Sequence, residues 1–521
     1  MKRKILGYVL MLLLVGSVIL TVHVQQVRSS EPPVTEWDET YGGTDFDTAT
    51  SVVQLDDGGY AIAGNTHSFA VDWSDAWLII TDANGKEQWN ETYNRQYRDE
   101  VYCLIRTSDG GYAMAGSTRP SFVGPIDAWL VKVDASGKKQ WDRLYGGPSD
   151  EYAYAVLQTS DGGYAFAGQT SSSGAGSIDF WLVKTDADGN MEWNQPYGGP
   201  DREEAFSMVA TDDGGYALVG YTESFGAGGY DCWLVKTDAD GNMEWNQTYG
   251  EKDDDRGHSI VQTTDGGYAL AGYTKSFGAG NFDAWLIKTD VNGKMQWNKT
   301  FACKLGTNDD YALSLIRTSD GGYALAGFTE SCGAGESDLW IVKTDAVGKM
   351  QWNKTHGRPY RDEAHSVVQT SDGGYAIAGT TQPYGSGDFD LWLIKLAREE
   401  ILATVDIDPD TLNLKSNGQW ITAYVELPEE YSLSEIDISS ILLNESISVD
   451  PEAPTEVGDY DVDSIPDLMV KFDRAAVIAL LGARDFGEET GKSVDVALAI
   501  TGDAAGMLFE GVDTVKVLLK G

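Results

Sequence analysis

The sequence predicts an all-β fold: a seven-bladed β-propeller closed by an N-terminal strand and followed by a C-terminal β-sandwich. Three observations predict it: a repeat of about fifty residues, two hairpin signals in every repeat, and tryptophans at two positions of each repeat. A period near fifty residues is typical of propellers and solenoids. The tetrapeptide Asp-Gly-Gly-Tyr marks the repeat and begins at Asp57, Asp109, Asp161, Asp213, Asp265, Asp320 and Asp372.

Each repeat contains four short segments with strand character. In residues 207–250, SMVAT and YALVGYT flank an Asp-Gly-Gly turn, and CWLVKTD and MEWNQTY flank a second turn at Asp240-Gly241. Asp-Gly between apolar segments is a strong hairpin signal. A Gly-rich loop joins the two hairpins, so each repeat predicts one four-stranded blade.

The tryptophans indicate how the ring closes. The fourth-strand set begins with Trp37, before the first Asp-Gly-Gly-Tyr, and the last repeat ends at WLIKLAREE without a fourth strand. The N-terminal segment EWDETYGG is therefore expected to supply the missing strand. Such pairing hides the open sheet edges, whereas a solenoid needs capping repeats. The propeller is predicted to span residues 31–398.

Residues 1–30 are predicted to direct export. A basic start, Met1-Lys2-Arg3-Lys4, precedes an apolar run from Ile5 to Val24. A run of about 20 residues can span a bilayer once as a helix, and its basic side stays inside. A cleaved secretory signal and an uncleaved anchor both remain open, because no Ala-x-Ala-like site follows. Either alternative places the rest of the chain outside the cell, secreted or anchored at the surface.

The net charge excludes some partners. The chain has 38 Lys and Arg residues against 81 Asp and Glu, a formal net charge of −43. Nucleic-acid binding needs a basic surface, so we expect no nucleic-acid partner, and contact with a membrane only through the N-terminal segment. At 42% hydrophobic residues, the chain is too rich in core-forming side chains to be disordered.

Residues 399–521 form the second predicted domain. The Gly-Trp period is lost there, and seven short segments with alternating apolar residues predict a β-sandwich. Residues 473–481 are compatible with a short helix instead.

An acidic loop in this domain predicts a calcium site. Carboxylates stand at positions 1, 3, 5 and 9 of the loop, and a backbone carbonyl at position 7 can complete the oxygen set that Ca²⁺ prefers. Ser464 and Val470 depart from the usual turn glycine and bidentate glutamate. We expect calcium as the cofactor, with a plain acidic loop as the alternative. The expected ligands are Asp459, Asp461, Asp463, Ile465 and Asp467.

No catalytic motif stands out in the sequence. Gly-x-Ser-x-Gly, His-Glu-x-x-His and Cys-x-x-Cys are all missing, and no helix follows the Gly-rich loops to bind a phosphate. The four cysteines occupy non-equivalent repeat positions. A bridge between Cys303 and Cys332 and unpaired, buried thiols are the two alternatives.

The repeat DGGYALAGYT…DxWLVKTDxxGxMxWN resembles the β-propeller repeats of secreted surface proteins of archaea and some bacteria. The resemblance covers residues 36–396 and implies an exported, cell-surface protein with a binding or structural role. The repeat also resembles, in part, the tryptophan repeat of quinoprotein dehydrogenases and related assembly factors, where the turn is one residue longer. The sialidase Asp-box is a poorer match. Residues 399–521 resemble small sandwich domains of archaeal surface proteins.

Carboxylates recur at three positions of the repeat. The turn aspartates suit a tight hairpin and are expected to be structural. A second set lies two residues before each third-strand tryptophan, where an Asx-type bond would close the preceding loop. This set comprises Asp75, Asp127, Asp179, Asp231, Asp283, Asp338 and Asp390.

The third set of acids lies at the start of each first strand. First strands line the channel of a propeller, so these acids are expected to crowd one channel mouth and to bind a cation or a basic partner. Solvation or hydrogen bonding to the backbone is the alternative. The predicted ring comprises Asp47, Asp99, Glu151, Glu203, Asp255, Asp310 and Asp362.

The sequence therefore predicts a non-enzymatic surface module whose partners are surface proteins or glycans. Short turns lie on one face of the ring, and the variable loops on the other face are where binding usually resides. A purely structural envelope component is one alternative. Another is an extracellular enzyme at the channel face, acting on polysaccharide or using a quinone-type cofactor. Arginines beside the acid ring keep the enzyme alternative open: Arg98, Arg202, Arg256 and Arg361.

Overall fold

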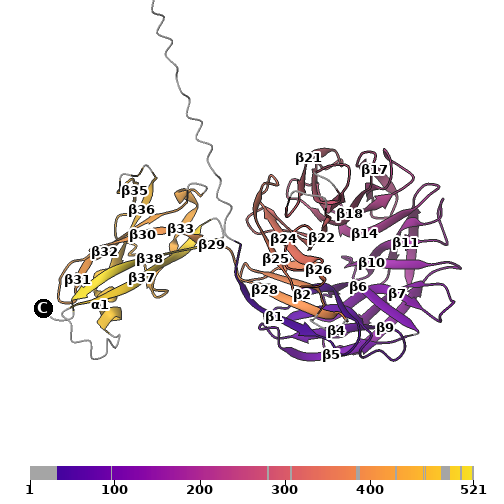
Figure 1. Ribbon diagram of the computed structural model, residues 1–521, viewed down its shortest axis with the longest axis horizontal. Coiled ribbons are helices and arrows are strands. Elements are labelled where there is room, and N and C mark those ends of the chain that lie inside the picture. Colours follow the sequence, from indigo (N-terminus) through magenta and orange to yellow (C-terminus); the bar gives the residue numbers. More distant parts are fainter. Residues whose placement is uncertain are drawn as a thin grey trace, which may run out of the picture.

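The computed structural model describes residues 32–518 apart from residues 96, 279–280, 305–307, 383–387, 429–430, 462, 464, 483–492 and 505–506. The regular secondary structure of the described residues is almost entirely β, and Figure 1 shows a ring of sheets beside a C-terminal domain. The predictions for residues 1–30 lie outside the described residues. No helix in the described part of the chain is long and apolar enough to cross a membrane.

The repeats form four-stranded antiparallel sheets, which we number 1 to 7 in chain order. Sheets 1 to 3 contain β2 (Asp47–Gln54), β3 (Tyr60–Thr66), β4 (Asp75–Thr81), β5 (Glu87–Tyr93), β6 (Arg98–Arg106), β7 (Tyr112–Arg119), β8 (Asp127–Val133), β9 (Lys139–Tyr145), β10 (Glu151–Gln158), β11 (Tyr164–Thr170), β12 (Asp179–Thr185) and β13 (Met191–Tyr197). Sheets 4 to 6 contain β14 (Glu203–Ala210), β15 (Tyr216–Thr222), β16 (Asp231–Thr237), β17 (Met243–Tyr249), β18 (Asp255–Gln262), β19 (Tyr268–Thr274), β20 (Asp283–Thr289), β21 (Met295–Phe301), β22 (Asp310–Arg317), β23 (Tyr323–Thr329), β24 (Asp338–Thr344) and β25 (Met350–His356). Sheet 7 contains β26 (Asp362–Gln369), β27 (Tyr375–Thr381), β28 (Asp390–Leu396) and β1 (Thr35–Tyr41).

The burial of each strand explains its sequence pattern. In sheet 4 every residue of the second and third strands, β15 and β16, is buried, and both strands are mainly apolar. The fourth strand, β17, exposes most of its residues. Hydrophobic cores form between neighbouring sheets; one of them combines Val219 and Leu234 of sheet 4 with Leu270 and Ile287 of sheet 5. The second and third strands of this sheet are therefore covered on both sides, whereas the fourth strand is covered on one side only.

The N-terminal strand belongs to the last sheet. β1 pairs antiparallel with β28, so the strand order is β1-β28-β27-β26. Trp392 Nε1 donates a hydrogen bond to Asp38 of β1 at 3.0 Å. In sheet 4, Trp233 makes the equivalent bond to Asn246 of its own fourth strand. The segment EWDETYGG thus supplies the strand that the last repeat lacks.

The fourth-strand tryptophans join neighbouring sheets. Trp193 of sheet 3 packs edge-on against Tyr216 of sheet 4, with ring centroids 6.2 Å apart. Its ring also lies against Gly241, which has a φ of +78° in the outer turn of sheet 4. A side chain at Gly241 would overlap the indole ring, so this turn requires glycine for both its conformation and its close approach.

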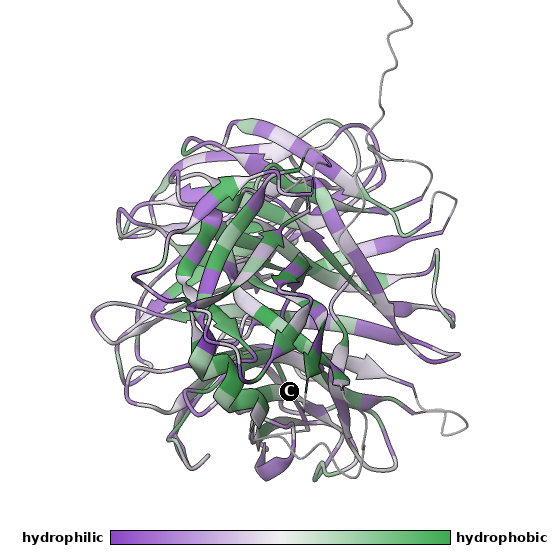
Figure 2. Cartoon of the chain, turned by 90° about the vertical axis from the view of Figure 1, so that its left-hand side faces the viewer, coloured by the Kyte–Doolittle hydropathy of each residue, from purple (hydrophilic) through white to green (hydrophobic). Residues whose placement is uncertain are grey.

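The C-terminal domain consists of two sheets that share one hydrophobic core. Its elements are β29 (Glu400–Leu402), β30 (Thr404–Asp408), β31 (Thr411–Asn413), β32 (Trp420–Glu426), the 3₁₀ helix Leu433–Glu435, β33 (Ile436–Leu443), β34 (Ile447–Ser448), β35 (Glu456–Gly458), β36 (Asp467–Asp473), α1 (Arg474–Gly482), β37 (Ser493–Ala504) and β38 (Met507–Leu518). The sheet orders are β30-β32-β36-β35 and β29-β38-β37-β33-β34, with β31 also on β38. Figure 2 shows hydrophobic and hydrophilic residues alternating along these strands. The helix that was an alternative for residues 473–481 is present as α1.

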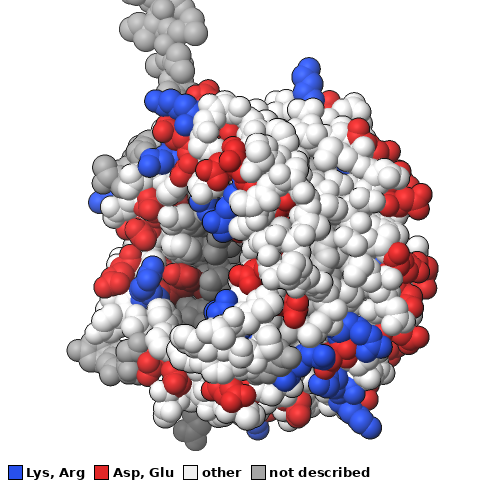
Figure 3. Space-filling model, turned by 90° about the vertical axis from the view of Figure 1, so that its right-hand side faces the viewer, with Lys and Arg blue, Asp and Glu red and all other residues white. Residues whose placement is uncertain are grey.

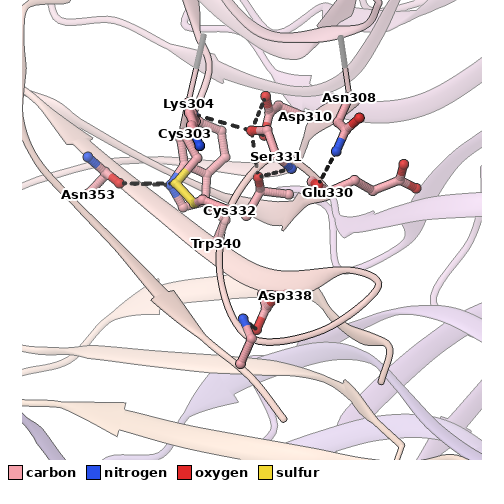
Figure 4. Close-up of a disulfide and its surroundings, with 12 residues drawn as sticks. Cys303, Lys304, Asn308, Asp310, Glu330, Ser331, Cys332, Asp338, Trp340 and Asn353 are labelled. Carbon is pink, nitrogen blue, oxygen red and sulfur yellow. Dashed lines mark hydrogen bonds between the residues drawn. A yellow bond between two sulfur atoms is a disulfide. The ribbon is translucent and has the colours of Figure 1, made fainter. Parts of the chain in front are cut away.

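Two of the four cysteines form a disulfide. Cys303 and Cys332 are bonded, with their Cα atoms 5.9 Å apart, and Figure 4 shows the bridge beside Trp340 and Asn353. It joins the loop after β21 to the loop between β23 and β24. Cys103 and Cys232 are free thiols. The structure therefore selects the bridged alternative for one pair and the unpaired alternative for the other two cysteines.

Candidate functional site

The antiparallel strand order gives the ring two different faces. The Asp-Gly-Gly turns and the outer turns lie on one face, which we call the short-turn face. The loops between second and third strands and the connections between sheets lie on the other, which we call the loop face. This is the arrangement that the sequence predicts.

On the short-turn face, each turn aspartate stabilises its own turn. Asp213 accepts hydrogen bonds from the Thr211 hydroxyl at 2.5 Å and from the Gly215 N–H at 3.1 Å. Lys236 reaches the same carboxylate from the third strand, with Nζ 2.9 Å from Oδ2. The glycine N–H bond recurs in all seven turns. The predicted structural role of the turn aspartates is confirmed.

The lysine in this network was not identified from the sequence as a partner of the turn aspartate. The third strand carries it in six repeats, and Ile80 replaces it in the first. The buried, paired lysines are Lys132, Lys184, Lys236, Lys288, Lys343 and Lys395. Hydrogen bonds from Thr211 and Lys236 lower the pKa of Asp213 to about 2. The signal was present in the sequence as the repeated Lys of WLVKTD.

The second set of acids closes the Gly-rich loops. Asp231 Oδ2 accepts a hydrogen bond from the Ala227 N–H at 3.0 Å, four residues earlier in the loop. Equivalent bonds occur in three other sheets, at Asp75, Asp179 and Asp338. The predicted Asx-type closure is confirmed at these four positions.

The third set of acids does not crowd an open channel mouth, which differs from the expectation. All seven side chains lie between sheets and are only 0 to 1% exposed. Asp255 accepts hydrogen bonds from the Thr274 hydroxyl, the Ser276 N–H and the Glu251 N–H. Similar bonds hold Asp47, Asp99, Glu151, Glu203, Asp310 and Asp362. Each carboxylate is buried and accepts at least one hydrogen bond, although Asp362 Oδ1 has no partner among the described residues. The structure therefore favours hydrogen bonding within the fold over direct contact with a cation or partner.

Acids of the second and third sets face one another between sheets. Burial raises the pKa of Asp231, and the negative charge of the neighbouring Asp255 carboxylate raises it further. Gly250 lies between the two carboxylates, and a Cβ there would come within 2.6 Å of Asp255 Oδ2. The same pairing occurs at Asp127–Glu151, Asp179–Glu203, Asp283–Asp310, Asp338–Asp362 and Asp390–Asp47. The framework of the loop face therefore holds like charges close together.

Residues one and three positions after each acid of the third set point to the centre of the ring, because side chains alternate along a strand. Figure 1 shows the first strands gathered around this centre. The first group comprises Thr48, Glu100, Tyr152, Glu204, Arg256, Tyr311 and Glu363. The second group comprises Thr50, Tyr102, Tyr154, Phe206, His258, Leu313 and His365. We call these two groups the inner positions.

The inner positions break the symmetry of the repeat. Sheets 2, 3, 4 and 6 place tyrosine or phenylalanine there, sheet 5 places arginine and histidine, and sheets 1 and 7 place threonine, glutamate and histidine. Successive ring contacts of 4.5–5.5 Å between centroids run through Tyr102, Tyr154, Phe206, His258, Tyr273 and Tyr311. Of these residues the sequence singled out only Arg256, although variable residues at fixed positions of an otherwise regular repeat were the signal for the others.

Two neighbouring loops on the loop face expose apolar side chains. Val71 and Trp73 in sheet 1 are 76% and 53% exposed, and Phe122 and Val123 in sheet 2 are 77% and 89% exposed. Tyr97 connects the two loops, with its ring centroid 6.3 Å from that of Trp73 and 6.4 Å from that of Phe122. We call this surface the aromatic strip: Phe46, His67, Phe69, Val71, Trp73, Tyr97, Phe122 and Val123.

The charged groups are unevenly spread over the surface. Figure 3 shows wide uncharged areas on one side of the molecule, with acidic and basic atoms mixed around a hollowed region. On this side the net charge of −43 does not produce a uniformly acidic surface. Apolar and arginine-containing sites are therefore compatible with an acidic chain.

The acidic loop of the C-terminal domain joins β35 to β36. Carboxylate oxygens of Asp459, Asp461 and Asp467 lie within 4.8 Å of one another, and those of Asp461 and Asp463 form a second group with Glu426. Four expected ligands thus come together, and Glu426 joins them from β32. The Ile465 N–H donates to Asp463, while Ser464 lies outside the described residues. Burial and then the nearby aspartates raise the pKa of Asp467, and calcium remains a prediction.

No model of a known protein family matches the chain. The chain is 23% identical to the regulatory protein FlaEY of Caulobacter vibrioides over 186 residues. The matched region covers 31% of this chain and 20% of that protein. The match therefore spans about a fifth of the length of this relative.

Solved structures with similar architecture are β-propellers of low sequence identity. The Pan2 WD40 domain of Neurospora crassa has a TM-score of 0.45 at 10% identity, covering 70% of this chain and 96% of that one. YCF48 bound to D1 peptide has a TM-score of 0.41 at 12% identity, covering 72% and 99%. The propeller domain of the trilobed protease from Pyrococcus furiosus has a TM-score of 0.39 at 11% identity, covering 68% and 94%.

Proposed function

We propose that this protein is an exported binding module of the cell surface. A closed, seven-bladed propeller binds a protein partner through its loop face, and a C-terminal β-sandwich serves as a spacer or second module. The aromatic strip carries the proposal, because exposed apolar side chains grouped on one face mark interaction surfaces. Aromatic residues are also enriched at the centres of protein–protein interfaces.

Contacts between the first and last sheets support closure of the ring. Tyr41 and Leu391 of sheet 7 share a hydrophobic core with Ile62 and Trp77 of sheet 1. The Tyr41 hydroxyl also donates to a turn carbonyl of sheet 1, as the fourth-strand tyrosines of sheets 1 to 4 do to the sheets that follow them. The contact between sheets 7 and 1 thus repeats the contact between sheets that are adjacent in sequence.

The chain enters and leaves the ring on the short-turn face. The Ala397 N–H donates to the Val34 carbonyl at 2.9 Å, and the Tyr375 hydroxyl donates to Glu399 at 2.7 Å. An N-terminal membrane anchor and the C-terminal domain would both lie on this side. The loop face would then point away from the membrane, where a partner can reach it.

Site-specific crosslinking on intact cells tests the docking surface. A photoreactive residue at Phe122 should give a discrete protein adduct that the substitution Trp73→Ser removes. The matched control is the same photoreactive residue at Met243, an exposed apolar position on an outer strand. Equal labelling from both positions, or an adduct that survives Trp73→Ser, would contradict docking at the aromatic strip.

Protease treatment of intact cells tests export, since an exported propeller is digested or shed while cytoplasmic markers survive. The competing hypothesis, an extracellular enzyme at the inner positions, predicts turnover of polysaccharide by the purified protein. We expect binding without turnover. Release of soluble saccharides that is lost on substituting His258 would replace our proposal with the enzyme.

Calcium at the acidic loop is a second proposal, favoured by the convergence of Asp459, Asp461 and Asp467. A divalent ion would relieve the repulsion between these carboxylates, and binding to the folded state raises stability by mass action. Calcium should therefore raise the unfolding temperature of the C-terminal domain in the full chain, and Asp461→Ala should abolish the rise. Magnesium is the control ion, and an unchanged transition with calcium would leave only the acidic-loop alternative.

A further inference from the structure

Arg256 occupies an inner position between sheets 4 and 5, where aromatic rings hold its side chain. The guanidinium carbon lies 4.2 Å from the ring centroid of Tyr230 and 4.6 Å from that of Tyr221. Both distances are within the range of cation–π attraction. The Tyr273 hydroxyl lies beside the same group. The rings fix the guanidinium from sheet 4 without neutralising its charge.

No carboxylate of the described residues forms an ion pair with Arg256, and its Nε is buried without a hydrogen-bond partner. The other arginines beside the acid ring are paired with a glutamate two residues later in the chain. These pairs are Arg98–Glu100, Arg202–Glu204 and Arg361–Glu363. In a chain with 81 acids and 38 bases, an arginine held in place without an acid is left able to bind an external anion.

A neutral histidine lies next to this arginine. The His258 ring stacks on Phe206, with centroids 4.5 Å apart and an interplanar angle of 5°, and on Tyr273 at 5.2 Å. Its Nε2 has no hydrogen-bond partner among the described residues. Burial and the Arg256 charge lower the pKa of His258 to about 3. A neutral imidazole can donate to or accept from a ligand hydroxyl.

The chemistry of these groups defines the ligand. A guanidinium binds a carboxylate through two parallel hydrogen bonds. The neighbouring aromatic rings can pack against apolar faces of the ligand that carries this carboxylate. Tyr273 extends the aromatic surface to Phe282 and Tyr311, at 5.1 Å and 4.7 Å. A polyanion would be repelled by the net charge of −43, so the ligand carries one isolated negative group.

We propose that Arg256, His258, Tyr230 and Tyr273 form a binding subsite for a single carboxylate carried by a sugar ring, such as an acidic residue at the end of a glycan. Arg256 binds the carboxylate, and His258 and the tyrosine hydroxyls bind the sugar hydroxyls. The subsite lies on sheets 4 and 5, whereas the aromatic strip lies on sheets 1 and 2. It therefore goes beyond the proposed docking of a protein and stands or fails separately from it.

Ligand-observed NMR with the full chain in detergent tests this subsite. The probes are methyl glucuronide, with one carboxylate on a sugar ring, and methyl glucoside, its neutral counterpart. We expect the glucuronide to bind at least tenfold more tightly than the glucoside, and Arg256→Gln to remove that difference. Arg256→Lys keeps the positive charge but cannot form the two parallel hydrogen bonds of a guanidinium, so it should weaken glucuronide binding several-fold.

Arg361→Gln is the matched control, because Arg361 already has a glutamate partner. It should leave glucuronide binding within twofold of the unaltered protein. An unchanged unfolding temperature in Arg256→Lys shows that lost binding does not reflect lost folding. Equal binding of the two sugars, or full glucuronide binding by Arg256→Gln, would overturn the proposal. If an acetylated dipeptide with a free carboxylate bound more tightly than methyl glucuronide, the ligand would be a peptide carboxylate and the proposal of a sugar ligand would be wrong.

Discussion

Aspartates on the two faces of one sheet lie in opposite electrostatic environments. On the short-turn face, hydrogen bonds from Thr211 and Lys236 lower the pKa of Asp213 to about 2. On the loop face, burial and the neighbouring Asp255 raise the pKa of Asp231. Both aspartates recur in every repeat, so repetition by itself does not reveal what an acid does.

The difference separates the acids that stabilise a turn from those that lie beside the proposed binding surfaces. The short-turn face pairs its aspartates with lysines of the same sheet in six of seven repeats. The loop face keeps its repeated acids buried in the framework and places the variable side chains of the aromatic strip and inner positions around them. Both proposed binding surfaces lie where the repeat varies, since the repeated positions are occupied by bonds within the fold.

Removal of β1 should have the largest effect, because sheet 7 loses its whole outer strand, from the loop face to the short-turn face. A chain that begins at Gly43 loses the buried Tyr41 and the partly buried Trp37 from the core between sheets 7 and 1, and it exposes the edge of β28 to aggregation. Thermal unfolding should show a sharply lower transition than in a chain that begins at Glu31. Equal transitions would contradict a closed ring.

Asp255→Ala should damage folding rather than binding. The substitution leaves the fully buried Thr274 hydroxyl without its acceptor, which costs about 1–3 kcal/mol for a buried group. Chemical denaturation measures this loss, and Asp253→Ala at a more exposed acid is the control. A loss of partner binding at unchanged stability would restore the ring of acids as a binding surface.

Replacing the two aspartates by asparagine should change stability in opposite directions. The depressed pKa of Asp213 means that its charge stabilises the fold above about pH 4, the unfolded value, and that this stability is lost as the pH falls towards 2. The raised pKa of Asp231 means that its charge disfavours the fold at neutral pH and that protonation relieves this.

At pH 7, Asp213→Asn should therefore destabilise the protein by about 1 kcal/mol or less, since its partly exposed ion pair is screened by solvent. Asp231→Asn keeps an oxygen for the Ala227 N–H and should be neutral or stabilising. Denaturation curves from pH 2 to pH 8 measure both effects. The same sign for both variants would show that the two faces do not differ electrostatically.

Ile80→Lys should have the smallest effect. It introduces into sheet 1 the lysine that the other six sheets pair with the turn aspartate, here Asp57. The new pair should raise stability by at most about 1 kcal/mol, measured by thermal unfolding. Ile80→Met is the control for the lost packing, and a lysine variant less stable than the methionine variant would show that sheet 1 cannot adopt the network.

Features that depend on local geometry could be predicted from the residues alone. Asp-Gly turns and the apolar pattern set four strands per repeat, and the displaced Trp37 located the strand that pairs with β28. The Asx bonds of Asp75, Asp179 and Asp338 followed from the same local chemistry. These features lie within a few residues of the chain or recur in every repeat, so a single sequence carries them.

The tertiary structure decided which side of each strand meets which neighbour. The acids of the third set were expected at a channel mouth, but the register turns them between sheets, where Thr274 and its counterparts bind them. The same register turns Arg256 and His258 to the centre of the ring, against Tyr221 and Phe206 of another sheet. Side chains of different repeats meet only when the sheets pack, because sequence spacing sets no contact between residues fifty positions apart.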